Sequence, residues 1–237
     1  MHSKPRNISA LLLLVSASVN AEVTIDGSLG GAAFDAVISG NGFTYDIQDT
    51  YGQSVGANLF HSFDKFNIGI DEHANFSGTN SIANIIARVT GGESSIAGRI
   101  TSSIDGSSLY MVNSAGFIFT NGAVVDVDGS LTVSTADYFE FSDGVRFYSN
   151  LSDTSTLSMT EISGFGFLSN GSGIIAIDSS GTVSSEEKPA SQNLYVNSDA
   201  ILIDDVDLQA GAIDIRMGDA AFGEIGIFDS ILESVEG

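Results

Sequence analysis

The feature that most constrains the fold is a succession of very short alternating segments within residues 109–147. In residues 125–128 and 131–134, apolar side chains alternate with polar ones, and Gly, Asn or Asp interrupts the pattern after a few residues. Alternation with a period of two indicates strands that bury one face. No helical periodicity fits this stretch. Strands separated by such short turns favour a coiled β-solenoid over a meander of long hairpins.

The spacing of these segments predicts the size of each coil. Strand centres lie about 5 to 9 residues apart, which fits coils of roughly 20 residues with three faces. Each strand would pair in parallel with the equivalent strand of the next coil, about 4.8 Å along the axis. The rival fold is a two-sheet sandwich, which needs longer strands and regular turns every 8–12 residues or so. We therefore predict an all-β fold, a single-stranded parallel β-helix.

Other segments add detail to this prediction. The aromatic-rich residues 56–68 predict an N-terminal cap on one end of the core, and residues 94–104 predict two short strands around Gly98. Residues 82–89 fit either one helical turn or two strands. The polar residues 179–193 predict a loop that projects from the core.

The two ends of the chain carry different signals. Residues 1–21 combine a basic start, an apolar run at residues 8–19 and a small-residue cleavage site, which predicts a signal peptide cleaved before Glu22. A buried N-terminal helix is the alternative. Residues 22–237 are then predicted to form one β-helix domain. Alternation continues up to Ile225 and Ile227 without a terminating motif, so we expect the coil to continue in a longer protein.

Charge and cysteine content exclude several classes of function. The formal net charge is −22, with 30 acidic and 8 basic residues, so the chain lacks the basic face that nucleic acid binding requires. The acidity indicates a solvated surface, with weak divalent-cation sites as the alternative. There is no Cys, which excludes disulfides and thiolate metal sites.

Candidate catalytic and metal-binding residues are few. His61 and His73 are the histidines outside the leader, and His61 lies in the aromatic run, where a packed histidine is the simpler interpretation. Calcium loops need further spaced oxygen ligands, which the acidic clusters do not supply. We therefore expect no enzymatic activity, no metal site and no cofactor. The acidic clusters considered are Asp126 with Asp128, and Asp204, Asp205 and Asp207.

Several blocks, in order, resemble one known family. The residues that carry the resemblance are NLFHSF with FN at 58–67, FSG at 76–78, IANIIARVTGG at 82–92, the block SLYMV through GVRF at 108–147, and GFGFL at 164–168. Together with the strands that follow, they cover about residues 27–218. Over this length the chain resembles the N-terminal secretion domain of filamentous haemagglutinins, also called the haemagglutination activity or two-partner secretion domain.

The resemblance implies a right-handed parallel β-helix and a role in export. A dedicated outer-membrane β-barrel transporter would recognise the domain through its periplasmic polypeptide-binding domains while the domain is still unfolded or extended. The exoprotein would cross the inner membrane by the Sec route and reach the surface of a Gram-negative bacterium or the medium. The alternative is a stand-alone surface adhesin whose β-helix binds glycans, host cells or other bacteria.

The resemblance also implies positions that recognise the transporter, although each of them has a structural alternative. The family's Asn-Pro-x-Gly signature falls at residues 113–116, where this chain has Ser114 in place of the proline. Because proline fixes φ near −65° in a turn, we expect Ser114 to give a looser turn. The implied partner-recognition residues are Asn58, Phe60, Asn113, Gly116, Thr135 and Asp137.

Overall fold

The computed structural model describes residues 22–30, 44–120, 123–168, 173–177, 193–198, 200–203 and 212–217. Strands dominate these ranges, and the helical element within them is one 3-10 turn, η1 (Asp49–Tyr51). The strands are β1 (Glu22–Ile25), β2 (Thr44–Gln48), β3 (Gln53–Val55), β4 (Asn58–Asn67), β5 (His73–Ser77), β6 (Asn84–Val89), β7 (Ser94–Ile96), β8 (Arg99–Ser102), β9 (Ser108–Val112), β10 (Gly116–Phe119), β11 (Val124–Asp126), β12 (Leu131–Ser134), β13 (Tyr138–Phe141), β14 (Arg146–Tyr148), β15 (Ile162–Gly166), β16 (Ile174–Ile177), β17 (Asn193–Ser198), β18 (Ala200–Ile203) and β19 (Ala212–Met217).

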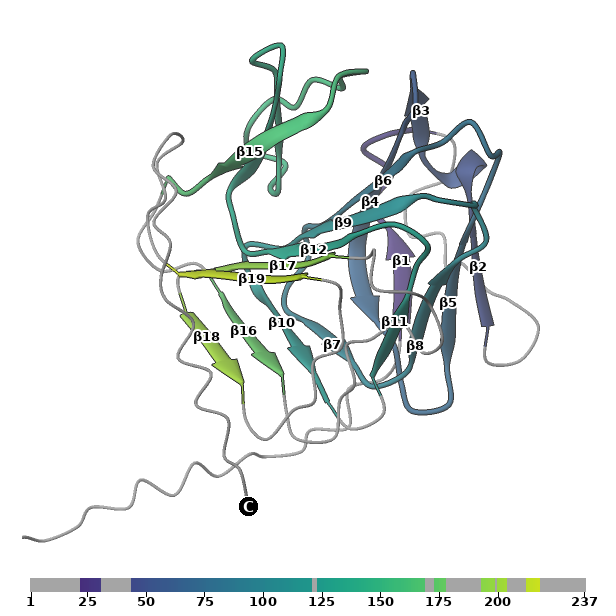
Figure 1. The fold of residues 1–237 in the computed structure, drawn as a ribbon, viewed down its shortest axis with the longest axis vertical. Coiled ribbons are helices and arrows are strands. Elements are labelled where there is room, and N and C mark those ends of the chain that lie inside the picture. The colour runs from purple at the N-terminus through teal and green to yellow at the C-terminus, as the bar shows by residue number, and fades with distance from the viewer. Residues whose placement is uncertain are drawn as a thin grey trace, which may run out of the picture.

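Three sheets wrap around a common axis, as Figure 1 shows, and their strands stack from β2 at one end to β18 and β19 at the other. The first sheet has the order β1-β4-β6-β9-β12-β17-β19, the second β18-β16-β10-β7 and the third β11-β8-β5-β2. From β4 onward, neighbouring strands in these sheets pair in parallel. The predicted parallel β-helix is confirmed.

The length of a coil follows from residues in register. Asn58 and Asn84 are paired in β4 and β6 and lie 26 residues apart, whereas Ser108 and Ser130 of later coils lie 22 apart. The coils are therefore somewhat longer than the roughly 20 residues typical of short solenoid repeats.

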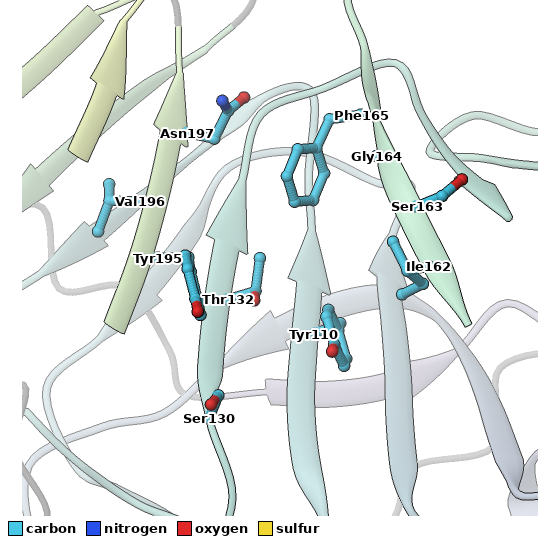
Figure 2. A pocket seen from close by; sticks show the side chains of 10 residues that line it. All are labelled: Tyr110, Ser130, Thr132, Ile162, Ser163, Gly164, Phe165, Tyr195, Val196 and Asn197. Atoms are coloured by element: carbon cyan, nitrogen blue, oxygen red, sulfur yellow. The ribbon is translucent and has the colours of Figure 1, made fainter. Parts of the chain in front are cut away.

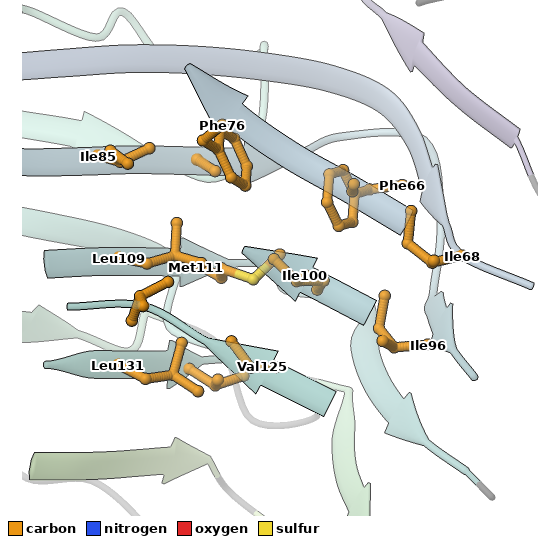
Figure 3. Packing of buried hydrophobic residues seen from close by; sticks show 14 of the residues in the cluster. Phe66, Ile68, Phe76, Ile85, Ile96, Ile100, Leu109, Met111, Val125 and Leu131 are labelled. Atoms are coloured by element: carbon orange, nitrogen blue, oxygen red, sulfur yellow. The ribbon is translucent and has the colours of Figure 1, made fainter. Parts of the chain in front are cut away.

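Inward-facing side chains form columns that run along the axis. Leu59, Ile85, Leu109 and Leu131 occupy one register position in four successive strands of the first sheet, and all four are buried. Figure 3 shows part of this core, in which isoleucines of the other sheets, such as Ile96 and Ile100, point toward the same interior. Each fully buried side chain of this size contributes about 1.5–3 kcal/mol, so the repeated columns are the main source of stability.

The N-terminal end of the coil is closed by antiparallel strands. The aromatic run does not itself form the cap, because it forms β4, the first strand of the first sheet that pairs in parallel with the next coil. β3 pairs with the first half of β4 and β1 with the second half, both antiparallel. The outer edge of β4 is therefore paired along most of its length, which protects it from pairing with another chain.

An additional sheet lies outside the coil. β13, β14 and β15 form an antiparallel sheet in the order β14-β13-β15, and Figure 1 shows β15 standing off the first sheet. The expectation that all of residues 109–147 coil is therefore wrong for β13 and β14. These strands belong to an insertion between β12 and β16, where β16 stacks on β10 and resumes the coil. In the first sheet the next strand after β12 is therefore β17, whose Ser198 lies 63 residues beyond its neighbour Thr135.

Several local expectations now have outcomes. Both alternatives for residues 82–89, one helical turn or two strands, are wrong, because residues 84–89 form a single strand, β6. In this strand Ile85 faces the interior and Ile86 the outer sheet. Residues 94–104 contain the two predicted strands, β7 and β8. The predicted signal peptide at residues 1–21, nearly all of the predicted loop at 179–193, and residues 225–227 lie outside the described residues.

Candidate partner-recognition site

Asn58 and Phe60 join the first coil to the outer sheet. Asn58, which is 1% exposed, donates through Nδ2 to the carbonyl oxygens of Ser158 (2.9 Å) and Thr160 (2.8 Å). Its Oδ1 accepts from Asn84 Nδ2 at 2.8 Å. Phe60 points to the same outer face, where its ring centre lies 5.2 Å from that of Phe147. Both side chains are therefore buried beneath residues that arrive much later in the chain.

Asn113 and Gly116 form a tight turn at a corner of the coil. Asn113 donates through Nδ2 to the Gly92 carbonyl (2.8 Å) and Ser94 Oγ (3.1 Å), and its Oδ1 accepts from Ala115 N–H. The Gly116 N–H closes the turn on the Asn113 carbonyl at 3.0 Å. Asn113 therefore ties this turn to the turn of the preceding coil.

Gly116 is required by two independent features. Its φ is +113°, a backbone conformation that side-chain-bearing residues rarely adopt. A Cβ atom there would also lie 2.6 Å from the Ile174 carbonyl oxygen of the next coil. The Ser114 carbonyl accepts from Gly173 N–H at 2.6 Å. The turn thus forms without the family's proline and stacks directly on the next coil.

Thr135 and Asp137 lie where the chain leaves the coil for the outer sheet. Thr135 is buried and donates through Oγ1 to Ser198 Oγ at 2.9 Å. The backbone of Asp137 bonds to Gly166 and Ser149 of the insertion, and its carboxylate accepts from Leu168 N–H. These two residues therefore fasten the start of the insertion to its end and to the next coil.

The structure does not bring the six residues together into one surface. Asn58 lies at the beginning of β4, whereas Asn113 and Thr135 follow the ends of β9 and β12. Of the six, Asp137 alone is partly exposed, and the other five are buried. In the folded protein these residues hold coils, turns and insertion together, and a partner could touch most of them only in an unfolded chain.

Sequence reasoning missed Arg88, which is at the centre of a buried polar cluster. Arg88 is 3% exposed and donates to Ser62 Oγ (2.6 Å), to Ser28 Oγ and Ser155 Oγ, and to the carbonyl of Tyr148. Its guanidinium also lies 4.6 Å from the centre of the Phe147 ring. A lone arginine at an outward position of the apolar run IANIIARV was the available signal, because a buried arginine needs partners.

Asp26 supplies the negative charge of this cluster. Burial alone would raise the pKa of Asp26, but hydrogen bonds from Ser62 and Ser28 and the charge of Arg88 outweigh burial and lower the pKa. Burial lowers the pKa of Arg88, and Asp26 opposes that effect. The pair therefore stays ionised at neutral pH and fastens the N-terminal segment to β6 and the insertion.

His61 occupies the interior, in agreement with its interpretation as a packed histidine. It is 1% exposed, stacks on Phe63 with ring centres 5.8 Å apart, and neither ring nitrogen has a partner among the described residues. Complete burial lowers the pKa of His61 to about 3. The neutral ring therefore behaves as part of the aromatic core.

The acidic residues considered as metal ligands have other roles where the structure describes them. Asp126 forms an ion pair with Arg99 at 2.7 Å, and Asp128 accepts from Gly106 N–H. Within the described ranges, no group of three or more histidine or acidic residues could hold a metal ion. Asp204, Asp205 and Asp207 lie outside those ranges. The described part of the chain also has no helix long and apolar enough to cross a membrane.

Comparison with models of protein families gives a match over most of the chain. A family model described as the TPS secretion domain matches residues 21–235, which is most of the chain. The matched stretch includes the blocks from residues 58 to 168 described above. No curated protein matches the sequence.

Proposed function

Because this chain belongs to the family of TPS secretion domains, which are domains of two-partner secretion exoproteins, we propose that a dedicated outer-membrane β-barrel transporter recognises it. Recognition would direct export of the exoprotein of which the chain is part. The observation that carries this proposal is the family match over residues 21–235. The chain would reach the periplasm through the Sec route, with residues 1–21 removed, and then cross the outer membrane of a Gram-negative bacterium.

The burial of the implied recognition residues suggests when the transporter acts. Asn58, Asn113 and Thr135 have their polar groups engaged inside the fold, and Phe60 is fully buried. The transporter's periplasmic domains would therefore contact these residues in the chain before the coils form. After export, the same residues would change role and hold the coils and insertion together.

Two measurements on an Asn113→Ala variant test this proposal. Loss of the Asn113 hydrogen bonds should lower the free energy of unfolding by about 1–3 kcal/mol, measured by denaturant unfolding of the refolded protein. Export is measured as the amount of protein in the medium when the variant is expressed with its transporter. We expect export to fall by more than the stability loss explains.

An Asn67→Ala variant is the matched control. Asn67 is also buried and accepts a turn hydrogen bond from Ser95 N–H, but it is not among the six implied residues. Equal export of the two variants at equal stability would assign Asn113 to folding alone. Export that does not depend on any transporter would contradict the secretion proposal itself and favour the stand-alone adhesin.

A further inference from the structure

The outer face of the second sheet is apolar and exposed. Figure 1 shows its strands side by side, on the side of the coil away from the insertion. Phe117 and Ile175 belong to the core, so the residues that alternate with them point outward. Ile174 is 42% exposed and Leu202 is 50% exposed. A contiguous apolar patch at the surface marks an interaction site. The outward residues are Ser95 on β7, Gly116 and Ile118 on β10, Ile174 and Ala176 on β16, and Leu202 on β18.

The other two outer faces are of a different kind. The insertion lies beside the first sheet, and Figure 2 shows Phe165 of β15 and Tyr110 of the first sheet lining one pocket between them. The third sheet carries Asp46, Arg99 and Asp126 at outward positions. By contrast, none of the residues of β7, β10, β16 and β18 is charged.

The lack of charge on this face indicates the kind of partner that fits it. The chain carries a net charge of −22, so two copies repel each other wherever their carboxylates meet. On the second sheet they can meet without that local repulsion. A basic partner, which the net charge attracts in general, would find no carboxylate on these strands. The face therefore fits an uncharged apolar surface, and an identical copy supplies one.

Large and small side chains alternate on this face in both directions. Along the axis, Ile118, Ala176 and Leu202 share one register position on three neighbouring strands. Along the strands, Gly116 precedes Ile118 on β10, and Ile174 precedes Ala176 on β16. An identical face laid against it can therefore place its large side chains over the small positions. Packed sheets interdigitate in this way.

We propose that two copies of this chain pack against each other through the outer faces of their second sheets. The contact is two-fold symmetric, so the same patch is used on both copies. Ile118, Ile174 and Leu202 of one copy lie over the small positions at Gly116 and Ala176 of the other. The contact forms between folded chains, so it does not depend on recognition by a transporter.

The described part of the face is small, which makes the contact weak. Four short strands about 4.8 Å apart present roughly 250 Å² per copy, whereas a standard interface buries about 800 Å² per partner. We therefore expect a Kd of about 0.1–1 mM. Chains held close together, as on a cell surface, would still pair, because tethering raises the effective concentration to about the millimolar range.

The test is sedimentation velocity of the whole refolded protein from about 20 μM to about 1 mM. We expect the mass to rise from monomer toward dimer over this range. Raising NaCl from about 0.1 M to about 0.5 M should strengthen association several-fold, because salt screens the repulsion between acidic copies. A monomer at about 1 mM in both salts, the result expected if another segment or an unlike partner covers this face, would overturn the proposal. Growth beyond the dimer would also overturn it, because a two-fold contact closes on itself.

Variants assign the association to this face. Ile174→Asp and Leu202→Asp should each raise the Kd by about 10-fold or more, because they bury a carboxylate in both halves of the contact. Ile70→Asp is the matched control: Ile70 is 69% exposed but lies between β4 and β5, near the N-terminal end of the coil, and its variant should associate normally.

Ala176→Leu tests the fit of large and small positions separately from apolarity. It fills a small position and should weaken association, whereas simple apolar adhesion would be strengthened by it. Thermal unfolding shows that each variant keeps its fold. Unchanged association in both Asp variants on the face, equal loss in Ile70→Asp, or stronger association of Ala176→Leu would each overturn the proposal.

Discussion

Protonation of His61 should make the stability of the folded protein fall with pH in a window that the structure defines. The pKa of His61 is about 3 in the folded protein, whereas an unfolded histidine titrates near 6.5. Between these values only the unfolded chain binds the proton. A group whose folded pKa is lowered contributes stability that is present above the unfolded pKa and lost as the pH falls toward the folded pKa.

The size of the effect follows from the difference in pKa. Each pH unit below about 6.5 lowers the free energy of unfolding by about 1.4 kcal/mol. The loss due to His61 should therefore be about 2 kcal/mol between pH 7.5 and pH 5, and about 5 kcal/mol once the pH reaches about 3. Asp26, Asp46 and Asp143 also have lowered pKa values, but their protonation lowers the free energy of unfolding only below about pH 4. Between about pH 4 and pH 6.5 the change in stability is therefore due mainly to the histidines.

The assay is guanidinium unfolding followed by far-UV circular dichroism at about pH 7.5 and about pH 5. A His61→Leu variant should lose about 2 kcal/mol less than the unmodified protein across this interval. At about pH 7.5 it should be at least as stable, because leucine removes two unpartnered nitrogens from the core.

His73→Asn is the control, because burial and the charge of Arg99 also lower the pKa of His73 but its ring is only partly buried. It should retain most of the pH dependence. If the His61→Leu variant shows the same loss as the unmodified protein, the argument that His61 is buried and unpartnered in the native state is refuted.

Three further predictions concern the corner turn and the buried polar cluster. Gly116→Ala should lower the free energy of unfolding by about 3 kcal/mol or more, because it adds backbone strain to a close contact with the next coil. Gly106 has a φ of +71° but open space around it, so Gly106→Ala should lower the free energy of unfolding by about 1 kcal/mol. Equal shifts in the denaturation midpoint would contradict this. Ser114→Pro should stabilise by about 0.4–1 kcal/mol through the unfolded chain, and a lower melting temperature would show that the turn rejects proline. Arg88→Met should cost about 3–5 kcal/mol by leaving Asp26 buried without its counter-charge, and Asp26→Asn in the same chain should recover part of that loss in denaturant unfolding.

The sequence predicted the coil well because inward and outward positions carry different chemistry. Leu131 and Val133 face the core while Thr132 and Ser134 face outward, and a period of two records that difference directly. The insertion could not be distinguished from the coil in the sequence, because Phe139 and Phe141 alternate with a polar residue in the same way. Alternation reports that one face is buried, but it carries no information on whether the partner strand is parallel or antiparallel.

The six recognition residues were inferred from the family resemblance and not from the residue pattern. The family match confirms the resemblance itself. The structural roles of the six residues could not be predicted because the partners are remote in sequence: Asn58 bonds to Ser158 and Thr135 to Ser198. Arg88 was overlooked for the same reason. Apolar residues at outward positions, such as Phe60 and Ile86, do indicate that something covers this face, but they do not identify the cover.

The insertion ties the first coil to segments that follow it much later, and this imposes an order on folding. The bonds from Asn58 to the Ser158 and Thr160 carbonyls span 100 and 102 residues. Such contacts have high contact order and form slowly. In a chain that emerges N-terminus first, Phe60 would stay uncovered until β13 and β14 arrive. The coils could therefore stack as they emerge, but the insertion could cover the outer face of the first coil only after Thr160 has emerged and bonded to Asn58.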